Sequence, residues 1–209
     1  MLIIKNGRLH IGDGTVIEKG DILINGTKIE QVAPEIVCEE AEVIDASGKE
    51  VFPGFIDPQS SIGAMGIPGR NMDTDETSSL VTPELNIKYS IDPDELNAQE
   101  FYKSGVTTVG CTPGNYNLFG GQVVAVKTAP QKMKDRILKE HAALKASVEA
   151  GVKSVFGGRK QMPMTRMATF DQFRKTIDAA RRATEKSRAQ EVLCDVFDKN
   201  AMSLFVAAE

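Results

Sequence analysis

Side chains that could bind a metal or act as nucleophiles are scarce in this sequence. The 209 residues include two histidines, His10 and His141, in different segments, and three widely spaced cysteines, Cys38, Cys111 and Cys194. The cysteines form no Cys-x-x-Cys pair, so a zinc site built from several imidazoles or thiolates is not expected. Cys111 follows a β-branched segment and has no histidine near it in sequence, which favours a small buried residue over a nucleophile.

Polar side chains follow a short apolar run that starts after a Pro53-Gly54 corner. Phe55-Ile56 is the run, and it ends in small polar residues. This pattern is typical of a buried parallel strand whose carboxyl end opens into a loop, the end at which parallel barrels carry their chemistry. Gln59 and Ser61 point to one side of such a strand, but their neutral oxygens bind zinc poorly. Asp57 is expected to fix the strand-end loop by hydrogen bonds.

A segment rich in glycine and asparagine is a second candidate. The amides of Asn115, Asn117 and Gln122 could line a substrate pocket together with backbone N–H groups, and Gly120 and Gly121 would permit close backbone approach. The alternative is a packed loop between two strands. The segment lacks the lysine and hydroxyl of a phosphate-binding P-loop, so it does not indicate nucleotide binding.

The first 50 residues predict short β-strands joined by turns. Asn-Gly pairs such as Asn6-Gly7 and Asn25-Gly26 are strong hairpin signals because both residues tolerate positive φ. We therefore expect a small antiparallel β module. Its strands are predicted at residues 2–4, 22–24, 28–32, 42–45 and 50–52. His10 is expected at a turn in an ordinary surface role.

From residue 51 onward, strands and helices alternate. Residues 63–90 form a long loop with an acidic patch at Asp73, Asp75 and Glu76, and loops of this length are usually functional or mobile. A helix is predicted from Asp92, with Pro93 and Glu95 in its first turn, to about residue 105. Further strands are predicted at 106–109, 122–126 and 203–207, helices at 131–150 (with His141 packed or on the surface) and 169–186, and a basic loop at 152–169.

Composition bounds the class of protein. The chain has 41% hydrophobic and 26% charged residues and a net charge of −4, which is ordinary for a globular protein and gives no indication of nucleic-acid binding. An odd cysteine count without a secretory signal favours a reducing compartment, and no apolar run approaches membrane-spanning length. We expect a cytoplasmic protein with neither nucleic acid nor membrane as a partner.

The motifs, taken in order, resemble the amidohydrolase superfamily, in its imidazolonepropionase-like and dipeptidase-like branch. They are Pro-Gly-Phe-Ile-Asp at 53–57, Asp-Glu-Thr-Ser-Ser-Leu-Val-Thr-Pro at 75–83, Gly-Val-Thr-Thr-Val at 105–109, Pro-Gly-Asn-Tyr-Asn-Leu-Phe-Gly-Gly-Gln at 113–122 and Thr-Arg-Met at 165–167. In the family, Pro-Gly-Phe-Ile-Asp is followed by a metal-binding His-x-His. In this chain Gln59 and Ser61 replace the two histidines.

The resemblance implies an α/β fold with an N-terminal β-sandwich (composite) domain at 1–52 and the first portion of a (β/α)8 TIM-like barrel at 53–209. Three strand-plus-helix units that all run in one direction cannot close an eight-stranded barrel, so we expect a half-barrel fragment or an open sheet. A strand at the last residues favours truncation. If that strand is the family's fifth, Ala207 and Glu209 occupy the region where an imidazole is expected.

The resemblance also implies a function. Family members hydrolyse C–N bonds in amides or cyclic amides, using zinc or another divalent metal to polarise the carbonyl and activate water. Lys127, at a strand end, is a candidate for the family's carboxylated, metal-bridging lysine, with an ordinary lysine as the alternative. Arg159, Lys160 and Arg166 could bind an anionic substrate or belong to a solvated loop. Because the histidine pair is replaced, we expect this chain to bind no metal.

Three hypotheses remain open at the level of sequence. In the first, the chain is a C–N hydrolase with an altered metal site that acts on a small-molecule substrate. In the second, it is a non-catalytic homologue that serves as a binding or assembly protein and forms a homo-oligomer. In the third hypothesis, a complementing half-barrel chain supplies the remaining strands. Without it, open sheet edges and apolar faces would stay uncovered.

Overall fold

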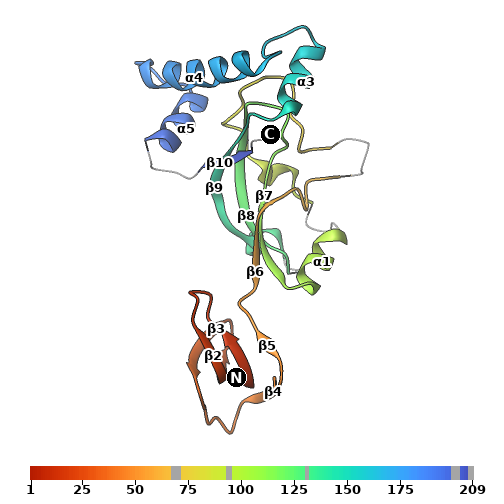
Figure 1. The fold of residues 1–209 in the computed structure, drawn as a ribbon, viewed down its shortest axis with the longest axis vertical. Coiled ribbons are helices and arrows are strands. Elements are labelled where there is room, and N and C mark those ends of the chain that lie inside the picture. Colours follow the sequence, from red (N-terminus) through yellow and green to blue (C-terminus); the bar gives the residue numbers. More distant parts are fainter. Residues whose placement is uncertain (67–71, 93–95, 130–131, 199–202, 207–209) are drawn as a thin grey trace. The chain divides into compact units, whose positions relative to one another are not determined.

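The computed structural model describes residues 1–66, 72–92, 96–129, 132–198 and 203–206 (Figure 1). The chain forms two compact units, Met1–Phe55 and Ile56–Glu209, and each is built around its own five-stranded sheet. Within the described ranges, no helix is long and apolar enough to cross a membrane.

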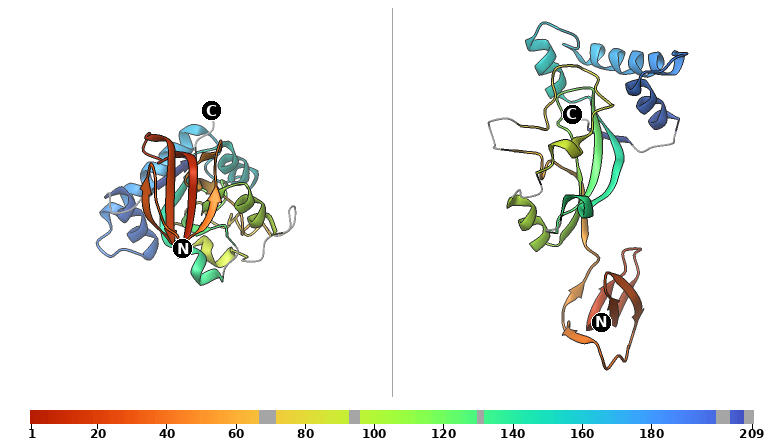
Figure 2. Two further views of the ribbon diagram at one scale, coloured as in Figure 1. Left: turned by 90° about the horizontal axis from the view of Figure 1, so that it is seen from below. Right: turned by 180° about the vertical axis from the view of Figure 1, so that it is seen from behind.

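The first unit contains β1 (Leu2–His10), β2 (Val16–Asn25), β3 (Lys28–Ala33), β4 (Glu42–Asp45) and β5 (Glu50–Val51). Strand β2 pairs antiparallel with β1 and β3, whereas β4 and β5 pair parallel with β1. The expected antiparallel sandwich is thus a single mixed sheet (Figure 2). Its core contains Ile3, Leu23 and Ile36.

The two Asn-Gly pairs behave differently. Asn25 pairs with Lys28 across the β2–β3 turn, where Gly26 has a φ of 61°, so the predicted hairpin is confirmed. Asn6-Gly7 makes no turn. It lies inside β1 at a register shift, with Asn6 at a φ of 62°, because the buried Asp21 carboxylate accepts the Asn6 backbone N–H at 2.9 Å and stabilises a bulge there.

The second unit contains β6 (Phe55–Ser60), β7 (Val106–Cys111), β8 (Phe119–Lys127), β9 (Ile137–Ser147) and β10 (Ser203–Val206), in the sheet order β10-β9-β8-β7-β6. Strands β7, β8 and β9 lie side by side (Figure 1) and run antiparallel, whereas β10 pairs parallel with β9. The α/β class is confirmed. The expectation of strand-plus-helix units all in one direction is wrong, because β8 returns directly beside β7 without a crossover helix.

The helix predicted at 131–150 is also wrong. A short helix α2 (Met133–Arg136) leads into the strand β9. Ile137 packs with one hydrophobic cluster and Leu144 with another, and the four residues 144–147 are all buried. A strand covered on both faces has no alternating pattern, and its apolar residues then match helical spacing by coincidence.

The remaining helices are η1 (Ile87–Ser90), α1 (Leu96–Lys103), α3 (Ala150–Gly158), α4 (Arg166–Arg182) and α5 (Arg188–Phe197). The helices predicted before residue 105 and at 169–186 are confirmed as α1 and α4, although the start signal at Pro93 and Glu95 lies outside the described residues. Helix α3 occupies part of the predicted basic loop. Phe173 of α4 stacks on Phe119 of β8 with ring centroids 5.0 Å apart, and Leu193 of α5 joins the same cluster.

Strand β6, the first of the second sheet, is less buried than predicted. Phe55 and Ile56 are 56% and 69% exposed, because β6 is an outer strand of its sheet with β7 as its neighbour. The strand also continues to Ser60. The final strand β10 agrees with its prediction from residue 203 to 206, and Ala207 and Glu209 lie outside the described residues.

Candidate functional site

A cavity of about 300 Å³, to which mostly polar residue types contribute, lies where β6 and β7 end. Four stretches of chain line it: residues 59–61 at the end of β6, 72–75 from the acidic loop, 112–116 after β7, and 149–151 at the start of α3. The sequence pattern at 53–61 predicted that chemistry would gather at a strand end, and the cavity lies there.

Close backbone contact between β6 and β7 sets the position of Gln59 and Ser61. A Cβ atom at Gly110 of β7 would overlap the carbonyl oxygen of Pro58, so the two strands can approach only because residue 110 is glycine. Thr112 then donates its backbone N–H to the Ser60 carbonyl at 2.8 Å. The Asp57 carboxylate accepts the Gln59 N–H at 3.0 Å, which agrees with the structural role predicted for Asp57.

Lys145 of β9 fixes residues 113–115, which follow β7 and form one wall of the cavity. The residue is 1% exposed, and its Nζ donates to the carbonyl oxygens of Pro113 at 3.1 Å and Gly114 at 3.5 Å, and to Asn115 Oδ1. All three ammonium N–H groups therefore have an acceptor. Burial lowers the pKa of Lys145 to about 8, while the carboxylates of Glu149 and Asp75 act in the opposite direction.

Two carboxylates belong to the lining. Asp75 Oδ1 accepts from the Thr74 hydroxyl at 3.1 Å and packs so closely on Gly114 that a Cβ there would overlap it. Glu149 occupies the N-cap position of α3, but its side chain makes no capping hydrogen bond. Its Oε2 is buried and, in the described part of the chain, has no hydrogen-bond partner.

The structure separates the residues that the sequence singled out. Gln59, Ser61 and Asn115 share the cavity. Lys127 does not, because it pairs with Thr108 at the start of β7, whereas the cavity lies beyond Cys111 at the other end. The antiparallel direction of β8 thus carries Lys127 away from the cavity.

The other amides and glycines of the candidate loop contact residues 76–85 or lie within β8. Asn117 donates to the Glu76 carbonyl at 2.8 Å and to the Thr82 hydroxyl at 2.9 Å. Gln122 donates to the Pro83 carbonyl at 3.3 Å. Gly120 and Gly121 lie within β8, and a Cβ at Gly121 would come 2.9 Å from the Leu85 carbonyl oxygen. Within this loop, Asn115 lines the strand-end cavity, Gly120 lines a second cavity of about 310 Å³, and Gln122 lines a third of about 180 Å³ beside His141.

The remaining candidates lie in other contacts. Cys111 is fully buried and its thiol donates to the Ile62 carbonyl at 3.3 Å. His141 lies on β9 and contacts Gln122 Oε1. Arg159 donates to the hydroxyl of Thr77 at 3.0 Å, so it ties the acidic loop to the end of α3.

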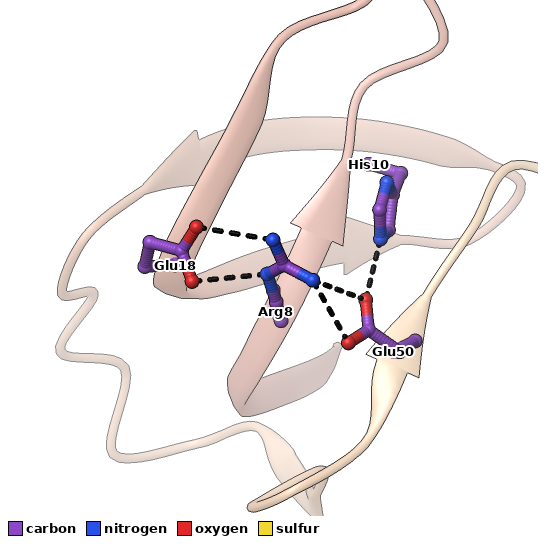
Figure 3. A network of polar contacts seen from close by, with 4 residues as sticks. All are labelled: Arg8, His10, Glu18 and Glu50. Atoms are coloured by element: carbon purple, nitrogen blue, oxygen red, sulfur yellow. Dashed lines mark hydrogen bonds and ion pairs between the residues drawn. The ribbon is translucent and has the colours of Figure 1, made fainter.

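In the first unit, His10 ends β1 and contacts Glu50, which also pairs with Arg8 (Figure 3). Arg8 bridges to Glu18 on β2 at 2.9 Å. The ring of His10 stacks on Phe52 at 4.1 Å. This exposed network agrees with a surface role for His10.

Two site residues escaped the sequence reasoning, Lys145 and Glu149. A single lysine between Leu144 and Ala146 is an exception in an apolar run, and buried lysines are rare unless they are paired. A lysine inside an apolar run was therefore the signal that could have identified Lys145. The helix predicted for this segment concealed it, because on a helix Lys145 would reach solvent.

The donor set at the cavity does not fit a catalytic zinc ion. Gln59 and Ser61 stand where the family resemblance implies imidazoles, and among the described lining residues only Asp75 and Glu149 offer anionic oxygens. In the described ranges as a whole, no three or more histidine, cysteine, aspartate or glutamate side chains form a group that could hold a metal ion. Zinc sites in proteins use imidazole, thiolate and carboxylate ligands.

Comparisons with known proteins agree with the motifs. No family model matches the chain. Amidohydrolase tasK of Hapsidospora irregularis is 29% identical over 193 residues, which cover 84% of this chain and 19% of that protein. A dihydroorotase of Streptococcus pyogenes is 46% identical over 57 residues, covering 27% of this chain and 14% of the enzyme. An allantoinase of Desulfitobacterium hafniense is 46% identical over 56 residues.

A solved structure extends the similarity to almost the whole chain. The crystal structure of an amidohydrolase from Thermotoga maritima superposes with a TM-score of 0.88 at 29% identity, and the match covers 98% of this chain and 57% of that one. The chain thus spans about a fifth of the length of the curated amidohydrolase tasK and somewhat more than half of the solved amidohydrolase. The ordered motifs, the curated relatives and this superposition all show that the chain is similar to members of the amidohydrolase superfamily.

Proposed function

We propose that this chain is a homologue of the metal-dependent amidohydrolases that binds a small polar molecule in its strand-end cavity and does not use a metal to hydrolyse C–N bonds. The observation that carries the proposal is the pair Gln59 and Ser61, which line the cavity where the family motif has its two histidines. The proposal keeps the family's domain plan, with a composite domain at 1–52 and the first portion of a (β/α)8 barrel from 53.

The chemistry of the lining supports binding over hydrolysis. Amide hydrolysis in this family depends on a metal that polarises the carbonyl and lowers the pKa of bound water. Neutral amide and hydroxyl oxygens bind such an ion weakly compared with imidazole or carboxylate, but they are good hydrogen-bonding partners for a ligand. Gln59, Ser61, Thr112, Asn115 and Tyr116 all line the cavity, whose volume of about 300 Å³ lies at the lower end of the usual range for ligand pockets.

Metal content tests this proposal. The 209-residue chain is purified without chelator and its zinc, manganese, iron, cobalt and nickel are measured by elemental analysis, with its mass in solution measured in parallel. We expect a folded sample with no stoichiometric metal. About one or two ions per chain, as in family sites, would overturn the proposal and restore C–N hydrolysis, which the names of the dihydroorotase and allantoinase relatives favour.

A second candidate role is assembly. Strand β6 is an outer strand and carries the exposed Phe55 and Ile56, and the solved relative has a further part of its chain beyond the matched 57%. Uncovered strand edges favour pairing with another chain, so a second copy or a complementing half-barrel chain would suit this edge. A monodisperse monomer over a wide range of concentrations would exclude the first, and failure to bind a separately produced C-terminal half of a relative would argue against the second.

A further inference from the structure

A cavity of about 180 Å³ lies between the sheet of the second unit and helix α5. Strands β8 and β9 form one wall and α5 forms the other, and none of the described residues that line it belongs to the strand-end cavity. We call it the α5 cavity. The second unit therefore has a cavity that the proposed function does not use.

Helix α5 lines this cavity with residues of opposite charge and an apolar surface between them. Arg188, Val192 and Asp195 are spaced by four and three positions, so they lie on one face of the helix. Val192 and Val196 are buried and belong to the same hydrophobic cluster as Leu144 of β9. Arg188 and Asp195 are seven positions apart, which corresponds to about 10 Å along the helix axis. The α5 cavity therefore has a cationic end, an apolar middle and an anionic end.

Both charged groups keep hydrogen-bonding capacity for a ligand. The Nη1 atom of Arg188 donates to Glu191 Oε2 at 3.2 Å, and its Nε and Nη2 have no acceptor among the described residues. In the same part of the chain, no hydrogen bond or ion pair engages the Asp195 carboxylate. Both residues are exposed, so a ligand can reach them. On the sheet wall, the Gln122 amide is occupied, because its nitrogen donates to a backbone carbonyl and its oxygen contacts His141.

Both charges lie at the less favourable ends of helix α5. The helix spans Arg188–Phe197, so Arg188 is its first residue and Asp195 lies in its last turn. A helix dipole is positive at the N-terminus and negative at the C-terminus, which disfavours a cation in the first turn and an anion in the last. The exposed pair of Arg188 with Glu191 returns little of this stability. Helix stability therefore does not explain these two residues, and such departures from a local rule are expected at functional sites.

For a bound molecule, the same arrangement is favourable. Arg188 and the N-terminus of α5 both attract a negative group, while Asp195 and the C-terminus both attract a positive group. The two remaining donors of the guanidinium suit the two oxygens of a carboxylate, and the Asp195 carboxylate accepts from an ammonium group. The buried Val192 and Val196 accommodate methylene groups between these ends.

We infer that the α5 cavity binds a small zwitterion whose carboxylate and ammonium group are separated by a few methylene groups, with Arg188 and Asp195 as its recognition residues. This inference goes beyond the proposed function, because it concerns a different cavity and requires no ligand in the strand-end cavity. The volume of about 180 Å³ lies below the usual range for drug-sized ligands, so the ligand is a small one. A dianion or a diamine would meet one charge of its own sign.

The test uses 5-aminopentanoate as the probe, with pentanoate and pentylamine as analogues that each lack one charged group, at matched ionic strength. Binding to the ¹⁵N-labelled 209-residue chain is followed by the chemical shifts of the backbone amides at 141–144 and 188–196. The cavity variants are Arg188→Gln and Asp195→Asn. Their matched controls are Arg182→Gln and Asp178→Asn, at exposed residues of α4 that do not line the cavity.

We expect saturable shifts with 5-aminopentanoate, and binding that is weaker by about tenfold or more for each analogue. Each cavity variant should weaken binding of the probe to a similar extent, and the control variants should bind like the wild type. Without ligand, both cavity variants should melt at or above the wild-type temperature, because each removes a charge that opposes the dipole of α5. Charges that served only to hold the fold together would instead lower the melting temperature when removed.

The absence of shifts at 141–144 and 188–196 would overturn the inference, as would equal binding of the probe and both analogues. Binding that neither cavity variant weakens would overturn it as well. Shifts confined to 112–116 and 149–151 would mean that the probe occupies the strand-end cavity, which also contradicts the inference. Metal content decides the proposed function separately, so the two failures can be told apart.

Discussion

The Nζ atom of Lys145 lies 3.1 Å from the carbonyl oxygen of Pro113, 32 positions earlier in the chain. A buried lysine of β9 thereby holds the segment that follows β7 and forms one wall of the cavity. The contact joins β9 to the segment after β7, although β8 lies between β7 and β9 in the sheet. The shape of the cavity therefore depends on a side chain that does not line it.

Lys145→Met should loosen that wall. Loss of the ammonium leaves the Pro113 and Gly114 carbonyls and the Asn115 amide oxygen without their donor, which lowers the stability of this segment. Removal of a buried charge is itself favourable, and it offsets part of the loss in the free energy of unfolding of the whole unit. We expect hydrogen exchange at 112–116 to quicken by about tenfold, with a smaller change in the free energy of unfolding. The exposed Lys134→Met is the control, and equal exchange in both variants would contradict the role of Lys145.

The same lysine predicts a dependence of stability on pH. Its pKa is lowered to about 8 in the folded chain from an unfolded value of 10.5, so between these values the unfolded state binds more protons. The free energy of unfolding should then rise as the pH increases from about 8 to about 10.5 through this group. Denaturant unfolding at several pH values should show this rise in the wild type and a reduced one in Lys145→Met. Identical profiles would argue against a shifted lysine.

Gly110→Ala should separate β6 from β7. The added Cβ would overlap the carbonyl oxygen of Pro58, a backbone atom that cannot rotate away, so we expect a loss of about 1–3 kcal/mol and a disturbed cavity. Gly158→Ala is a matched control at the end of α3, where no atom lies within 4 Å of the added Cβ. Urea unfolding of both variants measures the difference, and a neutral Gly110→Ala would refute the close contact.

Restoring the family's histidines should create affinity for zinc. In the double variant Gln59→His with Ser61→His, two imidazoles would enter a cavity that already holds Asp75 and Glu149, which together offer ligand types that zinc accepts. We expect zinc uptake by the double variant and none by the wild type, measured by elemental analysis after dialysis. The single variant Gln59→His, with one imidazole, is the control and should bind more weakly. Equal zinc content in wild type and double variant would contradict our interpretation of Gln59 and Ser61.

Turn residues, β-branched residues and helical spacing in the sequence predicted those elements whose structure depends mainly on residues near in sequence. The β2–β3 hairpin followed from Asn25-Gly26, β7 from its β-branched residues, and α4 from its apolar stripe. Helix α5 has an equally local signal, because Ser187 and Gln190 form a capping box, yet it was not predicted. Strand β9 could not be found in this way, since both faces of its last four residues are covered and its pairing with β8 overrides helical spacing.

The site shows the same division. Gln59 and Ser61 were found because the apolar run and polar residues at 53–61 form a pattern that is local in sequence. Asn115 was found because it belongs to the motif at 113–122. Lys127 ends a strand as predicted, but it lies away from the cavity because strand direction depends on long-range pairing, which the sequence of β8 alone does not specify. Glu149 and Lys145 became visible only when β9 and α3 brought them beside residues 112–116.

The cavity walls come from four stretches of chain that are distant in sequence. No one of them can form the cavity alone, so a compound that occupies it must bind the folded second unit in preference to the unfolded chain. Binding then stabilises the folded unit by mass action, by about 2.7 kcal/mol when the free ligand concentration is a hundred times the dissociation constant. The melting temperature rises accordingly. The thermal stability of this unit can therefore be measured to screen collections of small polar molecules for a ligand of the cavity.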